Sequence, residues 1–149
     1  GYNWGAGKLS RVRSIEKCCF SASAVVSLAA FVLILFFPEQ IVSLFMADGG
    51  EAATTMAVGA LRLFALTYIT RWFSFATQSY MMAIEKPMEA SMISVSTALI
   101  FPVILVAALW PLGLTGIWLN FAATAVLAAV LSLIIILKRK KELFAPDES

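Results

Sequence analysis

Length, composition and charge indicate an integral membrane protein. Of 149 residues, 61% are apolar and 13% charged, whereas globular chains carry about 45–50% and about 25%. Such a chain cannot hide its apolar surface in one small soluble core, so we expect the lipid bilayer to surround it. The net charge of +2 gives no indication of a nucleic-acid partner, and the absence of histidine excludes histidine metal sites, Ser-His-Asp triads and histidine proton relays.

Residues 1–17 are predicted to form a basic, cytoplasmic lead-in. One acid, Glu16, stands there among the basic residues Lys8, Arg11, Arg13 and Lys17. The adjacent Cys18 and Cys19 cannot form a zinc or CxxC site by their spacing, so we interpret them as reduced packing residues, with juxtamembrane palmitoylation as the alternative. Because the chain does not begin with methionine and shows no signal peptide, we expect it to be a piece of a longer polypeptide.

Four apolar segments are predicted to cross the membrane as helices. The first, 18–37, has no charged residue and would be about 30 Å long as a helix, which matches the hydrocarbon core. The uncharged run 90–137 would be about 72 Å long as one helix, so it must turn back, and the proline and glycines of 110–116 supply the break. The predicted spans are about 18–37, 58–84, 88–109 and 115–137, within a transmembrane segment 18–137.

Two shorter features modify this pattern. Pro38 and Glu39 end the first span, and the apolar segment 40–47 is too short to cross, so we expect it to lie at the membrane interface. Pro102 lies inside the third span, where it should kink the helix and free a backbone carbonyl.

The distribution of lysine and arginine predicts the orientation. The lead-in and the C-terminal segment 138–149 are basic, the loop between the first two spans holds only acids, and the turn at 110–116 has no charge. By the positive-inside rule, both ends of this segment are cytoplasmic, and we expect the bacterial inner (plasma) membrane.

The second span carries the candidate chemistry. Two arginines, Arg62 and Arg71, interrupt it, and a charge at the centre of a membrane helix costs roughly 2.5–3.5 kcal/mol. Side chains at helical spacing around Arg71 form a stripe that mixes a cation, hydroxyls, an amide, aromatics and a methionine, as a wet cavity for amphipathic organic ligands would. The stripe consists of Thr67, Tyr68, Arg71, Ser74, Phe75, Gln78 and Met82. Interhelical hydrogen bonding is the alternative for its uncharged polar members.

Arg71 has no obvious partner in the sequence. Arg62 can reach the outer interface, but Arg71 lies about 13 Å deeper, and none of the four spans contains an acid in its charge-poor part. Either missing helices provide a partner or Arg71 lines an aqueous path. Asn120 and Pro102 are secondary candidates. No catalytic constellation is visible, so we do not expect an enzyme.

Four pieces of the chain resemble signatures of the multidrug and toxic compound extrusion (MATE) transporters, in the same order. GYNWGAGKLSRV is similar to the "yNyGAgk" signature that precedes the ninth helix of that family. FFPEQIVSLF, SYMMAIEKP and IFPVI…WPLGLTGIW resemble the "fPe.i..lF", "ffqaigkp" and "iPl…lgltGvw" stretches. The resemblance covers nearly all of residues 1–137.

This resemblance implies a fold and a function. The chain would be the last four of twelve helices, part of the C-terminal lobe of an all-α membrane transporter whose N-terminal helices are missing. The family exports drugs and organic compounds, often cations, by antiport with Na⁺ or H⁺. The resemblance implies no other cofactor and no metal site, and it does not assign the site of the coupling ion within this chain, since the family often has an acid for that purpose in the first helix of the missing lobe.

Three departures from the family pattern bear on this expectation. Met82 stands where the family often has glutamine, and Glu85 where it commonly has glycine. Arg71 stands near the position at which some branches of the family carry an acidic cation ligand. An arginine at that position argues against direct sodium coordination by this lobe. The alternatives are a relative that flips lipid-linked substrates and a four-helix membrane scaffold subunit without transport activity.

Overall fold

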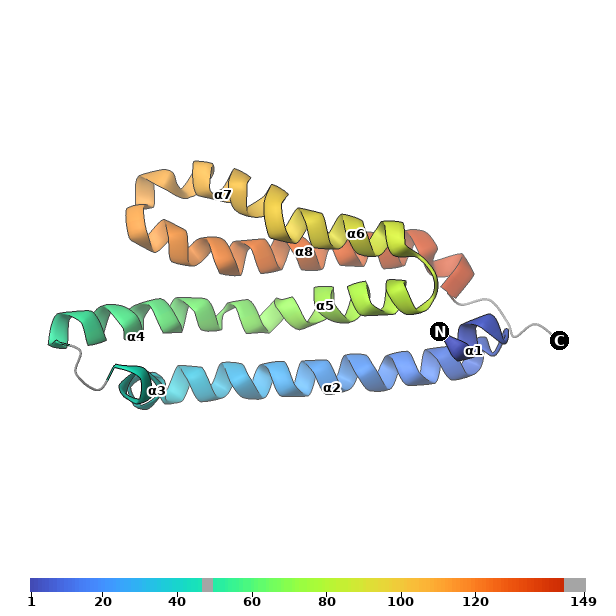
Figure 1. The fold of residues 1–149 in the computed structure, drawn as a ribbon, viewed down its shortest axis with the longest axis horizontal. Helices are drawn as coiled ribbons and strands as arrows, with labels where there is room; N and C mark the ends of the chain where they lie inside the picture. Colours follow the sequence, from blue (N-terminus) through green and yellow to red (C-terminus); the bar gives the residue numbers. More distant parts are fainter. Residues whose placement is uncertain (47–49, 144–149) are drawn as a thin grey trace.

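The computed structural model describes residues 1–46 and 50–143, apart from the side chains of residues 141 and 142, and every regular element in this part of the chain is helical. The elements are α1 (Tyr2–Gly5), α2 (Leu9–Phe36), α3 (Pro38–Phe45), α4 (Glu51–Ala65), α5 (Thr67–Ala83), α6 (Pro87–Val95), the π-helical turn η1 (Ser96–Ile100), α7 (Phe101–Leu109), the 3₁₀ turn η2 (Trp110–Leu112) and α8 (Gly113–Leu143). The long helices lie side by side as an elongated bundle (Figure 1).

The helices meet the requirements of a membrane protein. Among the described residues, Leu9–Phe36 and Pro87–Lys140 are long and apolar enough to cross a bilayer, and the bent pair α4–α5 would make a third span. The second of these stretches folds back at η2, so that α7 and α8 lie against each other (Figure 1). An all-helical apolar bundle is therefore confirmed, whereas four crossings remain a prediction.

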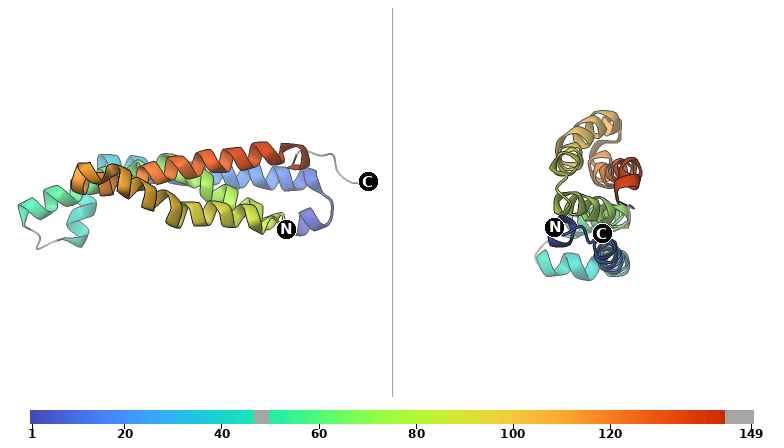
Figure 2. Two further views of the ribbon diagram at one scale, coloured as in Figure 1. Left: turned by 90° about the horizontal axis from the view of Figure 1, so that it is seen from above. Right: turned by 90° about the vertical axis from the view of Figure 1, so that its right-hand side faces the viewer.

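The first helix is longer than the sequence pattern indicated. It begins at Leu9 rather than at Cys18, because no proline or glycine interrupts the basic lead-in after Gly7. It ends at Phe36, and Pro38 then opens α3 at its first helical position, where proline is well tolerated. Figure 2 shows α3 lying across the end of α2, an arrangement that fits the interfacial position predicted for 40–47.

The second predicted span is not one continuous helix. It breaks between α4 and α5 at Leu66, where the two axes differ by 45°. The Leu66 N–H donates to the Leu63 carbonyl over three residues rather than four, so the chain tightens locally at the break. No proline or glycine lies there, so the sequence offered no signal for the bend.

The third predicted span is irregular near Pro102, as expected, and the irregularity is a π-helical turn. Pro102 has no N–H to donate to the carbonyl of Ala98, four residues earlier, and the chain accommodates this with the π-helical turn η1 just ahead of it. The Phe101 N–H donates five residues back to the Ser96 carbonyl. A widened turn therefore stands where a simple kink was expected.

A left-handed residue forms the turn between α5 and α6. Glu85 has φ +61, and the Lys86 N–H donates to the Met81 carbonyl at 2.8 Å, which closes α5 as a Schellman motif does. Glycine is the residue that adopts this conformation without strain. The left-handed conformation of Glu85 thus explains why the family commonly has glycine at this position.

The tightest packing joins α5, α6 and α8. Met81, Ile93 and Ile135 belong to one buried cluster there. Small or polar buried residues recur every fourth position along α8 and let its backbone approach its neighbours. They are Gly116, Asn120, Thr124, Ala128 and Ser132.

The outer surface is apolar. Large hydrophobic side chains are exposed on α2, α7 and α8, and α2 contains no buried residue. In water such a surface would be a liability, whereas in a bilayer or against further helices it is the expected one.

Candidate binding groove between α2 and α5

Two cavities lie along the side of α5 that faces α2. The first, of about 390 Å³, is bounded by α1, α2 and α5, and we call it the Tyr80 cavity. The second, of about 430 Å³, lies among α2, the α4–α5 bend and α8, and we call it the Arg71 cavity. Phe75 lines both, and Ser23 and Ser27, one helical turn apart on α2, line one each. The two cavities thus form one interrupted groove.

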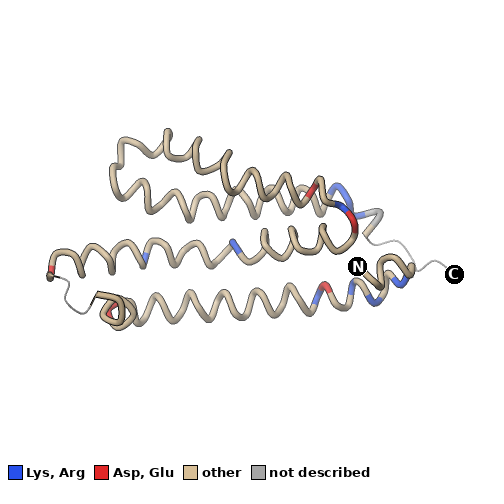
Figure 3. Tube along the Cα trace, in the orientation of Figure 1, with Lys and Arg blue, Asp and Glu red and all other residues tan. Residues whose placement is uncertain are grey.

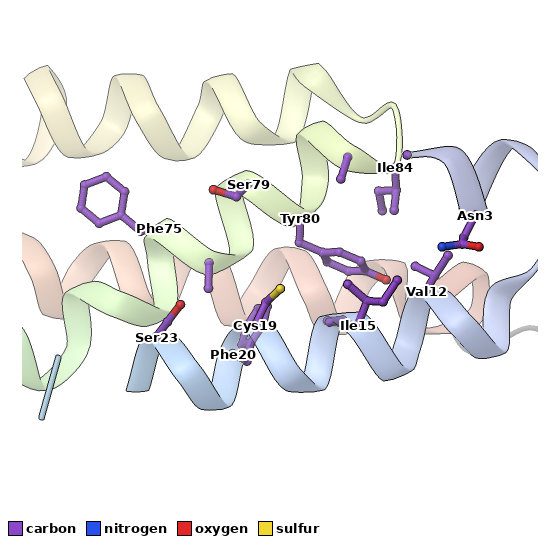
Figure 4. A pocket seen from close by; sticks show the side chains of 14 residues that line it. Asn3, Val12, Ile15, Cys19, Phe20, Ser23, Phe75, Ser79, Tyr80 and Ile84 are labelled. Atoms are coloured by element: carbon purple, nitrogen blue, oxygen red, sulfur yellow. The ribbon is translucent and has the colours of Figure 1, made fainter. Parts of the chain in front are cut away.

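The Tyr80 cavity combines apolar walls with a few polar groups. Figure 4 shows the Tyr80 ring reaching from α5 toward Val12 and Ile15 of α2, with Cys19 and Ser23 further along that helix. Tyr80 itself is only 8% exposed, and its hydroxyl has no hydrogen-bond partner of regular geometry among the described residues.

A carboxylate lines the same cavity. Glu16 is partly buried on α2 and interacts electrostatically with Tyr80, although their geometry falls short of a regular hydrogen bond. Sequence reasoning missed this residue, because it is one acid among four bases and was assigned to the lead-in before the first span. The signal was present in the spacing: Glu16, Cys19, Ser23 and Ser27 repeat at three and four residues, which places them on one face of α2.

The Arg71 cavity holds a cation within aromatic walls. The guanidinium carbon of Arg71 lies 5.1 Å from the centre of the Phe75 ring. Aromatic rings pack edge to face around the space, with centroid distances of 5.5 Å for Phe64–Phe121 and 6.0 Å for Phe64–Tyr68. The hydroxyl-bearing residues Ser27, Thr67 and Tyr68 also line it.

The predicted stripe divides between different environments. Thr67, Tyr68 and Arg71, together with Phe75, line the Arg71 cavity. Ser74 is buried and donates to the Arg71 carbonyl at 2.9 Å, whereas Gln78 is partly buried and Met82 is 58% exposed. None of these three lines either cavity. All seven residues lie on α5, so the predicted stripe does not face a single cavity along the whole helix.

The secondary candidates lie outside both cavities. Asn120 is buried on α8 and accepts a hydrogen bond from the Thr124 hydroxyl at 3.2 Å. Pro102 opens α7 after the π-helical turn. Their observed roles are in helix packing and backbone geometry.

Ion pairs mark the two ends of the bundle. Arg62 donates to Glu39 at 2.9 Å and ties α4 to α3, and Arg139 pairs with Glu89 to tie α8 to α6. Figure 3 shows lysine and arginine gathered at the end that holds α1 and the last turns of α8. Among the described residues, no carboxylate forms an ion pair with Arg71.

Comparison with known proteins identifies the family. A family model described as MatE matches residues 1–108, which include all helices from α1 to α6 and most of α7. The chain belongs to the MatE family. No curated protein and no solved structure matches it. Members of this family are membrane transporters rather than enzymes, so the apolar bundle and its groove belong to a transport protein of the MATE type.

Proposed function

We propose that this MatE chain acts in secondary active multidrug efflux, exporting organic compounds by antiport with Na⁺ or H⁺. In this proposal it is the C-terminal part of a twelve-helix transporter and crosses the bacterial inner membrane four times. The observation that carries the proposal is the groove between α2 and α5 in a chain of this family.

The groove has the composition of a site for varied organic compounds. Ligand sites are mostly apolar and aromatic, with a few placed polar groups. Phe20 and Phe75 supply such walls in the Tyr80 cavity, where Glu16 and Asn3 are polar. Both cavities are partly open, so further helices of the same transporter would complete them. The apolar, unburied surface of α2 supports such a neighbour.

The charge distribution supports the proposed orientation. Basic residues gather at one end of the bundle, which holds the start of α2 and the last turns of α8 (Figure 3). The positive-inside rule places that end in the cytoplasm. The Tyr80 cavity would then lie near the cytoplasmic side and the Arg71 cavity deeper in the membrane.

Glu16 is the carboxylate that this groove offers to a coupling cation. It lines the Tyr80 cavity, is partly buried, and lies beside a buried hydroxyl that lacks a regular partner. A carboxylate oxygen and a phenol oxygen are hard oxygen ligands, and a carboxylate can equally carry a proton. Arg71 argues against sodium coordination near its own position, but Glu16 lines the other cavity. We therefore revise that expectation and propose that Glu16 exchanges Na⁺ or H⁺ in this lobe.

Gradient-driven dye efflux from membrane vesicles containing the full-length transporter tests this function. We expect efflux under an imposed sodium or proton gradient, and loss of the gradient dependence in Glu16→Gln. Glu85→Gln, at the exposed turn after α5, is the matched control and should keep it. Absence of gradient-driven efflux in the wild type would contradict the proposed function.

A further inference from the structure

We infer that the Arg71 cavity binds the anionic group of an aromatic organic compound, such as a carboxylate or sulfonate. This inference rests on the proposed transport function and states which charge the substrate pathway prefers. Because Arg71 is itself positive, the cavity would disfavour a cationic group, although organic cations are the substrates that the family resemblance suggests first.

The charge of Arg71 is the first argument. A guanidinium carries a positive charge and presents a planar fork of donors that suits a carboxylate or sulfonate. Arg71 is partly buried, lines the cavity, and has an aromatic ring rather than a described carboxylate beside it. A ligand anion would supply the counter-charge that the described residues do not.

An unpartnered hydroxyl is the second, independent argument. Thr67 is 1% exposed and lines the cavity, yet among the described residues its hydroxyl makes no hydrogen bond. Thr77, on the same helix, donates at 2.8 Å to the carbonyl four residues earlier, as threonines in helices commonly do. The corresponding carbonyl for Thr67 is that of Leu63, which belongs to α4, on the other side of the 45° bend at Leu66. The bend thus leaves a buried donor beside Arg71.

The aromatic walls complete the argument. An aromatic cage attracts cations through the faces of its rings. Here Arg71 itself occupies the Phe75 face, and its charge repels a second cation in surroundings of low dielectric constant. Phe64, Tyr68 and Phe121 remain to stack on the aromatic part of a ligand. Rings for an aromatic body and donors for an anionic head therefore meet in one cavity.

A pair of xanthene dyes tests the inference. Fluorescein is an anion and rhodamine 123 a cation on a similar ring system, and both are measured by efflux and by fluorescence polarisation with the purified full-length transporter. Arg71→Gln should weaken fluorescein binding and efflux about tenfold or more relative to rhodamine 123, because a charge-assisted contact is lost. Arg71→Lys should keep part of the preference. Arg62→Gln, which removes the exposed arginine of α4, should leave the dye ratio unchanged.

The outcomes separate the inference from the proposed function. The anion site would be contradicted if Arg71→Gln weakened the binding of both dyes equally, or if the wild type bound rhodamine 123 but not fluorescein. In either case, gradient-driven efflux of rhodamine 123 would still support the transport function. Fluorescein binding that depends on Arg71, without gradient-driven efflux of either dye, would support the anion site and contradict the transport function.

Discussion

The two sides of α5 differ in how they treat polar groups. Toward α6 and α8 the helix is closely packed, and the hydroxyls of Ser74 and Thr77 donate to carbonyls of their own helix. Toward α2 it is hollowed, and the hydroxyls of Thr67 and Tyr80 are buried without regular partners beside a charged side chain in each cavity. A buried polar group left unpaired costs free energy, and a ligand in the groove could offset that cost for Thr67 and Tyr80. The division is not complete, because the Thr70 hydroxyl is also buried without a partner among the described residues and lines a cavity of about 400 Å³ on the α7 and α8 side.

The largest effect is expected at Gly116, where α8 packs against the end of α7 behind the packed side of α5. A Cβ atom there would lie 2.3 Å from the carbonyl oxygen of Leu109, so Gly116→Ala should force α7 and α8 apart. We expect a loss of about 1–3 kcal/mol or more, since overpacking moves backbone. Thermal unfolding of the detergent-solubilised transporter measures it. Gly59→Ala, with open space around its Cβ, is the control, and equal stability of the two variants would contradict the packing described.

One substitution on each side of α5 compares the two regions directly. Ala128 is fully buried on α8, whereas Ala76 is partly buried and lines the Tyr80 cavity. Ala128→Leu should lower stability by about 1–3 kcal/mol, while Ala76→Leu should leave the unfolding temperature nearly unchanged and reduce efflux by filling the cavity. The reverse pattern would show that the cavity is not part of the transport path.

The two kinds of hydroxyl give a subtler comparison. Thr77→Val removes a hydroxyl that donates within its helix and should cost about 1 kcal/mol. Thr67→Val removes a buried hydroxyl without a partner, so stability should stay the same or rise, while fluorescein binding falls. Unfolding temperature and dye binding are measured on both variants. Loss of stability in Thr67→Val would mean that its hydroxyl already has a structural partner.

The smallest effect is expected away from both sides of α5. Glu85 adopts φ +61 at the turn into α6, and Glu85→Gly should relieve that strain and raise stability by about 0.5–1 kcal/mol. Transport should not change. A lower unfolding temperature would show that the Glu85 side chain holds the turn by a contact that outweighs the strain.

The sequence predicted the features that depend on local chemistry. Pro38 and the charged loops marked helix ends, the uncharged run 90–137 required a turn back, and the cost of burying a guanidinium singled out Arg71. The bend at Leu66 could not be predicted from the sequence, because no proline or glycine lies there. Glu16 was overlooked because the spacing from Glu16 to Ser27 places it on one face of α2 but does not show that α5 packs against that face, which is a contact between distant segments.

Protection of a single cysteine tests most directly whether the groove is the transport path. Ser27 lines the Arg71 cavity and Ser21 is exposed on α2 outside both cavities, so Ser27→Cys and Ser21→Cys are compared in a background where Cys18 and Cys19 are replaced by serine. We expect a water-soluble thiol reagent to inactivate efflux through the Ser27→Cys variant, and fluorescein to protect it, with neither effect for Ser21→Cys. Unhindered efflux after complete labelling of the Ser27→Cys variant would contradict the account.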